Sequence, residues 1–169
     1  MLARSIHGRS DTARAQRAAM HPGQEPIPRA APADGLFAGS AMTFISFLAV
    51  GFGAFAGAVL RWLLGLALNP LLPTLPLGTL AANLLGGLIM GGAMGLFAHY
   101  ETLPIALRLA ITTGFLGGLT TFSTFSAETV TLFLRQQYAW TAIIIAAHLF
   151  GSLLMTLAGI GIVRMLLRA

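Results

Sequence analysis

The sequence contains no cysteine and no lysine, and only 9% of its 169 residues are charged. Without cysteine, the chain has no disulfide framework and no thiolate metal site. Without lysine, it cannot form a phosphate loop of the Gly-Lys-Ser/Thr type. An average soluble domain carries about 25% charged residues, so this chain has too few charges to cover a water-facing surface.

Catalytic and nucleic-acid signals are also missing. The histidines at positions 7, 21, 99 and 148 do not cluster, which argues against a zinc site. No His-Glu-x-x-His or Gly-x-Ser-x-Gly pattern occurs. The ten arginines give a net charge of +5, but they are scattered and form no basic patch. We therefore expect neither an enzyme nor a nucleic-acid-binding protein.

The chain falls into two parts of different composition. Residues 1–41 are rich in Arg, Ala and Pro and contain no apolar run, so they cannot bury enough surface to fold. We expect a disordered extension, or a start codon assigned too early, since Met42 directly precedes the apolar region. Residues 42–169 hold long uncharged stretches, which are typical of membrane helices of about 20 apolar residues.

The uncharged stretches predict four membrane spans, at about residues 42–67, 77–98, 105–134 and 139–166. The fold class is therefore an all-α membrane protein with very short loops. A continuous helix over 105–134 would be about 45 Å long, which exceeds a hydrocarbon core of about 30 Å. Its middle is rich in Gly and Thr, which are weak helix formers. We predict a broken third helix near residues 117–121, with exposed carbonyls that can bind a cation. The alternative is one long tilted helix.

Small residues recur at four-residue spacing in the first three spans, as in Gly53 and Gly57, and this spacing predicts close helix packing. Polar residues within the spans are costly and therefore candidates for function. Arg61 and Glu128 are expected at similar depth, which predicts an ion pair that offsets the cost of burying each charge. Their role could be this structural pair, snorkelling to the interface, or direct contact with a substrate. Asn83 is a candidate donor or interhelical contact.

The fourth span carries His148, Ser152 and Thr156 at four-residue spacing, so the three share one helix face. The hydroxyls could instead bond to carbonyls of their own helix, and His148 could be a packed interface residue.

Phe122 and Phe125 flank the hydroxyls of the third span, and their electropositive ring edges could favour an anion. Charges near the span ends are nearly balanced, three Arg against two outside the extension, so they hardly select one orientation.

Three strings, Gly53–Trp62, Gly78–Asn83 and Gly117–Glu128, together resemble the Fluc or CrcB family of fluoride channels. The resemblance covers residues 44–167, and the string Thr-Thr-Phe-Ser-Thr-Phe is its most specific part. It implies an antiparallel, dual-topology homodimer in the bacterial inner membrane that passively exports fluoride. Partners would be a second copy, fluoride and the lipid bilayer.

The resemblance also implies roles for individual residues. Backbone carbonyls of Gly117 and Thr120 from both subunits would bind one structural, non-transported Na⁺. The fluoride pathway would be lined by Asn83, Phe122, Ser123, Phe125, Ser152 and Thr156. Supporting polar or charged residues would be Arg61, Thr79, Thr121 and Glu128.

Two other interpretations remain open. A small dual-topology drug/proton antiporter has a similar size but requires an acid in its first helix, and the first span here has none. A membrane scaffold without transport activity would explain the glycine spacing, but it would have no use for the hydroxyl-rich break.

Overall fold

The computed structural model of the protein describes residues 44–72 and 74–168. The expected N-terminal extension, residues 1–41, lies outside the described residues. Within these described ranges, four segments are long and apolar enough to span a membrane: Phe44–Leu71, Leu77–His99, Ile105–Leu134 and Tyr138–Arg168. The four predicted spans are therefore confirmed to within a few residues at each end.

Proline and short polar turns separate the spans. Helix α3 (Phe44–Leu68) continues into the 3-10 turn η1 (Asn69–Leu71), where Pro70 ends the regular helix. The side chain of Asn69 accepts a hydrogen bond from the Gly78 N–H at 2.8 Å, which ties this turn to the start of α4 (Leu77–His99). Arg108 closes the next turn by donating to the carbonyls of Tyr100 and Glu101 at 3.0 and 2.9 Å.

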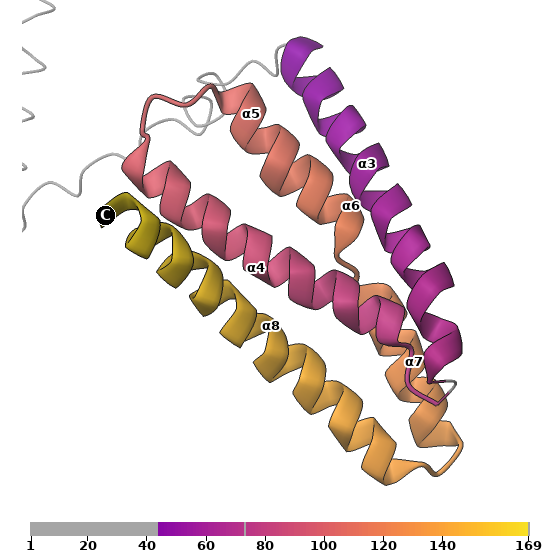
Figure 1. Cartoon of the computed structure of the whole chain (residues 1–169). Coiled ribbons are helices and arrows are strands. Elements are labelled where there is room, and N and C mark those ends of the chain that lie inside the picture. Colours follow the sequence, from indigo (N-terminus) through magenta and orange to yellow (C-terminus); the bar gives the residue numbers. More distant parts are fainter. Residues whose placement is uncertain (1–43, 73, 169) are drawn as a thin grey trace, which may run out of the picture. The chain divides into compact units, whose positions relative to one another are not determined.

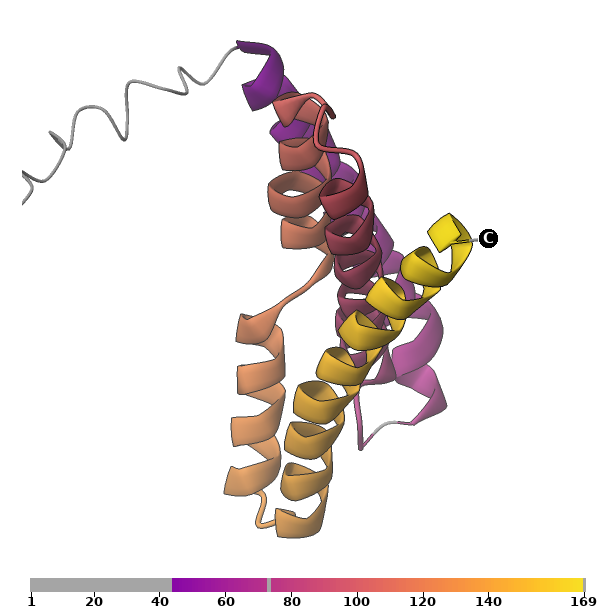
Figure 2. The same cartoon turned by 90° about the vertical axis from the view of Figure 1, so that its left-hand side faces the viewer.

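The third span is composed of four short pieces. They are α5 (Ile105–Leu109), the π-helix η2 (Ala110–Leu116), α6 (Gly117–Leu119) and α7 (Phe122–Leu134). Thr120 and Thr121 between α6 and α7 have extended backbone angles. Figures 1 and 2 show this link between the two halves of the span. The predicted break is confirmed, whereas the π-helix was not anticipated.

The spans pack in pairs through their small residues. Helix α4 lies along α8 (Tyr138–Arg168), and α3 lies along η2 and α6 (Figure 1). A Cβ atom at Gly57 would overlap the carbonyl oxygen of Phe115, and one at Gly91 would overlap that of Thr156. Helix backbones therefore touch at these glycines, as the four-residue spacing predicts.

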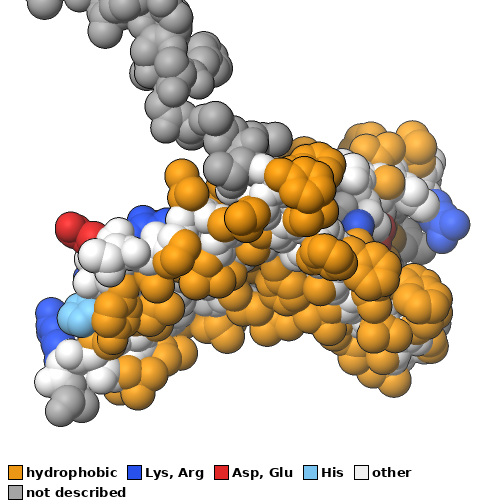
Figure 3. Space-filling model, turned by 90° about the horizontal axis from the view of Figure 1, so that it is seen from above, with side chains coloured by type: hydrophobic (Ala, Val, Ile, Leu, Met, Phe, Trp, Pro, Cys, Tyr) orange, Lys and Arg blue, Asp and Glu red, His pale blue; other side chains and the backbone are white. Residues whose placement is uncertain are grey.

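The buried core is small and divided. One cluster consists of Ala82, Leu116 and Leu119 at the centre, and the other of Leu75, Leu132 and Ile144 near one end. The face seen in Figure 3 is mostly hydrophobic, and its charged side chains lie mainly toward the two ends. This distribution matches a bilayer, in which the apolar band contacts lipid and charges reach the interfaces.

Candidate functional site

The break in the third span is held open by Asn83 of α4. The Thr121 N–H donates to the Asn83 Oδ1 at 2.8 Å, and the Asn83 Nδ2 donates to the Thr121 carbonyl at 3.1 Å. A side-chain amide thus satisfies both backbone groups of one unwound residue. Because backbone polar groups in a membrane must find partners within the protein, Asn83 explains why the chain can leave the helix here.

The break removes the usual helical partners from two carbonyls. The Thr121 N–H, which would pair with the Gly117 carbonyl in a continuous helix, goes to Asn83 instead. The Thr124 N–H, which would pair with the Thr120 carbonyl, donates to the Thr121 Oγ1 at 3.2 Å and caps α7. Gly117 and Thr120 are the residues whose carbonyls the family resemblance assigns to Na⁺.

A cavity of about 660 Å³ lies beside the break, between α4, the third span and α8. It is lined by most of the predicted pathway and sodium-site residues: Asn83, Gly117, Thr120, Phe122, Phe125, Ser152 and Thr156. Thr112, Thr121 and His148 also line it, and no Asp, Glu, Lys or Arg of the described residues does. The fold therefore collects amide, hydroxyl, imidazole and aromatic groups around a space without fully charged side chains.

Aromatic rings form one wall of this cavity. The ring centroids of Phe122 and Phe125 are 5.6 Å apart at 60°, and those of Phe125 and His148 are 4.5 Å apart at 31°. Phe122 is 78% exposed in the single copy, so much of its surface is left for another partner. Ser123 is the one predicted pathway residue outside the cavity lining, and its hydroxyl lies 3.2 Å from that of Thr121.

The two hydroxyls on the polar face of α8 differ: one bonds within its own helix, and the other has no partner among the described residues. Thr156 donates to the Ser152 carbonyl one turn earlier, at 2.9 Å, as hydroxyls in membrane helices commonly do. Among residues 44–72 and 74–168, the Ser152 hydroxyl has no hydrogen-bond partner, so it is free to contact a solute in the cavity. His148 is buried and lies 3.0 Å from the amide nitrogen of Asn83.

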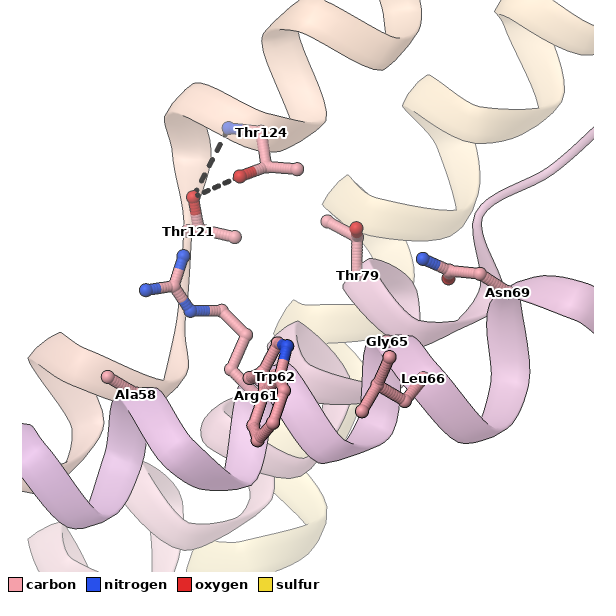
Figure 4. A pocket seen from close by; sticks show the side chains of 9 residues that line it. All are labelled: Ala58, Arg61, Trp62, Gly65, Leu66, Asn69, Thr79, Thr121 and Thr124. Carbon is pink, nitrogen blue, oxygen red and sulfur yellow. Dashed lines mark hydrogen bonds between the residues drawn. The ribbon is translucent and has the colours of Figure 1, made fainter.

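A second cavity, of about 480 Å³, lies on the other side of the break (Figure 4). Arg61, Thr79, Thr121 and Thr124 contribute to its lining, and the guanidinium of Arg61 extends toward Thr121 (Figure 4). The hydroxyl of Thr121 donates to that of Thr124 at 3.0 Å. Thr121 lines both cavities, so the break separates two polar spaces.

The predicted ion pair between Arg61 and Glu128 is wrong. Glu128 instead accepts a hydrogen bond from the Thr79 hydroxyl at 2.6 Å. Within the described chain, the Nε of Arg61 and the Oε2 of Glu128 are buried and have no partner. The similar depth of the two residues in the membrane stays a prediction, whereas the direction in which each side chain points around its helix axis depends on packing. The sequence could not supply those directions.

Among the polar residues that line these cavities, sequence reasoning gave no pathway role to Asn69, Thr112, Thr124 and His148. Thr112 and Thr124 are hidden among many threonines, and no spacing distinguishes them. His148 was considered a packed interface residue, yet it lines the larger cavity and contacts Asn83. Its four-residue spacing from Ser152 had placed it on the same helix face, but did not show that it lies beside Asn83. No group of three His, Cys, Asp or Glu residues able to hold a metal occurs in the part of the chain that the structure describes.

Fold and site together define a small multi-pass membrane protein with two polar cavities at a broken helix, the larger of which is lined by no fully charged side chain among the described residues. A family model described as "CrcB-like protein, Camphor Resistance (CrcB)" matches residues 48–160. The chain belongs to this CrcB family.

Curated relatives are similar over nearly their whole length. A protein of Nitrosospira multiformis is 62% identical over 125 residues, which cover 74% of this chain and 98% of the relative. One from Tolumonas auensis is 55% identical over 73% of this chain and 98% of the relative. One from Chromobacterium violaceum is 60% identical over 68% and 91%. Each is named a fluoride-specific ion channel, FluC. The relatives are thus ion channels and not enzymes.

Proposed function

We propose that this protein is a fluoride-specific ion channel that lets fluoride leave the cell passively, down its electrochemical gradient. The observation that carries the proposal is 62% identity to a fluoride-specific channel along 98% of that relative. The larger cavity supports it, because its lining suits a small anion that must exchange water for fixed donors. A lining without full charges can bind the ion weakly enough to release it, as conduction requires.

The working unit we propose is an antiparallel homodimer. In the most apolar window of each span, no more than 22% of the residues are buried within one copy. Phe122, at the wall of the larger cavity, is mostly exposed. A second copy would cover such surfaces and complete the cavities, and the nearly balanced span-end charges allow it to insert in the opposite orientation.

The residues at the break fit a structural Na⁺. The carbonyls of Gly117 and Thr120 lose their helical partners, and hard cations prefer oxygen ligands. Two carbonyls per copy are few for a cation, so an antiparallel partner would supply the remainder. When bound, the ion would contribute a fixed positive charge near the pathway. We expect the unfolding temperature of the purified protein to fall when Na⁺ is replaced by a bulky organic cation, and an unchanged temperature would contradict the sodium site.

The experiment that tests the function is anion efflux from liposomes that contain the purified protein. We expect rapid fluoride efflux and no chloride efflux. Replacing both Phe122 and Phe125 by Leu should greatly slow fluoride efflux, whereas the same replacement at Phe52, which is 73% exposed on α3, is the matched control. Intact flux in the Phe122→Leu, Phe125→Leu variant would refute the proposed pathway.

The same liposomes distinguish the two other interpretations. Flux that requires an imposed pH gradient would indicate a proton-coupled transporter. Absence of any flux from folded protein in Na⁺ would indicate a scaffold.

A further inference from the structure

The turn between α4 and α5 holds an arginine in a fixed position. The Nη2 of Arg108 donates to the carbonyls of Tyr100 and Glu101 at 3.0 and 2.9 Å. The guanidinium carbon also lies 5.2 Å from the ring centroid of Phe97, within the range of a cation–π contact. Because the guanidinium is already held, a ligand that binds it costs little further side-chain freedom.

Much of the hydrogen-bonding capacity of Arg108 is unused. A guanidinium carries five N–H donors, and the two bonds in the turn come from Nη2 alone. Both bonds go to neutral carbonyls, and within residues 44–72 and 74–168 Arg108 makes no ion pair. Its Nε and Nη1 donors and its full charge are therefore left for an acceptor from outside the described chain, and phosphate oxygens are among the acceptors that arginine binds most strongly.

Arg108 lies where the headgroups of a bilayer are expected. The second span ends at His99 and the third begins at Ile105. Arg108 follows Ile105 by three residues, which is about 4.5 Å along a helix, and its side chain reaches back to the turn. Arginines near span ends place their charge at the membrane interface. The guanidinium is thus at the level of lipid phosphates.

This end of the spans also carries more positive than negative charge. Arg164 and Arg168, near the end of α8, are exposed and form no side-chain hydrogen bond or ion pair with the described residues. The last turns of α4 and α8 lie at the same end, because a Cβ atom at Gly95 would be 3.1 Å from that of Val163. Of the two acidic residues in the described ranges, only Glu101 is here. Figure 3 shows arginine side chains and one acidic group at this end, on the left.

Exposed apolar side chains lie next to the turn. Leu96 precedes it, and Ile105 and Leu107 follow it, with exposed fractions of 38%, 61% and 44%. A headgroup at Arg108 would therefore place its acyl chains against apolar surface. A water-soluble phosphate would gain nothing from that surface, so the combination of fixed charge and adjoining apolar surface favours a lipid.

We propose that the turn between α4 and α5 binds the headgroup of an anionic phospholipid. Arg108 donates to the phosphate, and the positive charges of Arg164 and Arg168 favour a lipid with a net negative charge. No residue of this lipid site lines either of the two cavities. The proposal is therefore independent of which ion the protein conducts.

Native mass spectrometry can count lipids that stay bound to the purified protein. The protein would be titrated in detergent with equal amounts of phosphatidylglycerol, which is anionic, and phosphatidylcholine, which has no net charge. We expect the native protein to retain phosphatidylglycerol preferentially. Arg108→Gln should weaken its binding about tenfold, the effect of losing a charge-assisted hydrogen bond. Arg135→Gln, at the end of α7, removes one arginine from the opposite end and is the matched control.

A second variant covers the possibility that Arg108→Gln disturbs the turn that Arg108 closes. The double variant Arg164→Gln, Arg168→Gln changes no hydrogen bond of the described chain, and it should lose much of the preference for phosphatidylglycerol. If Arg108→Gln does not fold, this double variant decides. A preference unchanged in the folded variants, or lost equally in Arg135→Gln, would overturn the proposal.

The native protein provides two further tests. Equal retention of the two lipids would overturn the preference for an anionic headgroup. Soluble glycerol phosphate distinguishes a lipid from a free phosphate as the ligand. We expect it not to displace phosphatidylglycerol at equal concentration, because it lacks acyl chains. Full displacement would show that the turn binds free phosphate and would overturn the lipid assignment.

Discussion

At the scale of single residues, Glu128 is a carboxyl group on a membrane helix, and within residues 44–72 and 74–168 its side chain makes one hydrogen bond. That bond comes from the Thr79 hydroxyl at 2.6 Å and joins α7 to α4. Replacing Thr79 by Val preserves the side-chain shape and leaves the whole carboxyl without a partner. We expect a loss of about 1–3 kcal/mol in the free energy of unfolding, measured by denaturation in detergent.

Thr141→Val is the matched control for Thr79→Val. Thr141 is also buried, but its hydroxyl bonds only to the Gln137 carbonyl at the start of its own helix. Equal losses in the two variants would show that the contact with Glu128 contributes nothing specific.

Gln136, between α7 and α8, adopts a left-handed backbone conformation with φ of 60°. Its N–H bonds to the Phe133 carbonyl and that of Gln137 to the Leu132 carbonyl, at 2.9 and 3.0 Å, which is a Schellman helix end. Glycine adopts this conformation without a Cβ penalty, so Gln136→Gly should raise stability by about 0.5–1 kcal/mol. Gln137→Gly is the control, and thermal unfolding would compare them. A destabilised Gln136→Gly would contradict the expected gain.

At the scale of elements, the third span depends on close contact with α3. A Cβ atom at Gly57 would meet the Phe115 carbonyl of η2, and Phe115 cannot yield without moving its backbone. Gly57→Ala should therefore separate α3 from η2 and cost about 1–3 kcal/mol. Gly51→Ala on the same helix meets no atom within 4 Å and is the control. Thermal unfolding of both variants in detergent is the measurement, and equal stability would show that the contact is not tight.

The third span also shows which features of its structure could be predicted from the sequence. The density of Gly and Thr near residues 117–121 predicted the break, because both are weak helix formers. Unwound backbone within a membrane is possible only where the protein or a water-filled cavity satisfies its polar groups. The π-helix at Ala110–Leu116 could not be predicted, since its hydrogen bonds, which span one residue more than those of an α-helix, depend on packing and leave no signature in these residue types. Asn83 was identified as a polar candidate, but its pairing with Thr121 was not.

At the scale of the whole molecule, orientation in the membrane can be measured at the two ends of the spans. The native chain has no cysteine, so single cysteines can report which side each end faces. Gln137→Cys and Glu101→Cys lie in turns at opposite ends of the spans. If the protein inserts both ways, about half of the copies of each variant should react with an impermeant thiol reagent from outside the cell. Full labelling of one variant and none of the other would show a single orientation.

The sequence by itself determined the membrane class, the four spans, the broken third helix and the glycine contacts. These features follow from composition, run length and spacing along one helix, which neighbouring helices scarcely change. The tertiary structure alone decided that Glu128 bonds to Thr79 and not to Arg61, and that Asn83 holds Thr121 and His148. Such pairings depend on how each helix is rotated about its axis. A turn of a few tens of degrees moves a side chain from one partner to another, and only the packing of all four spans fixes that rotation.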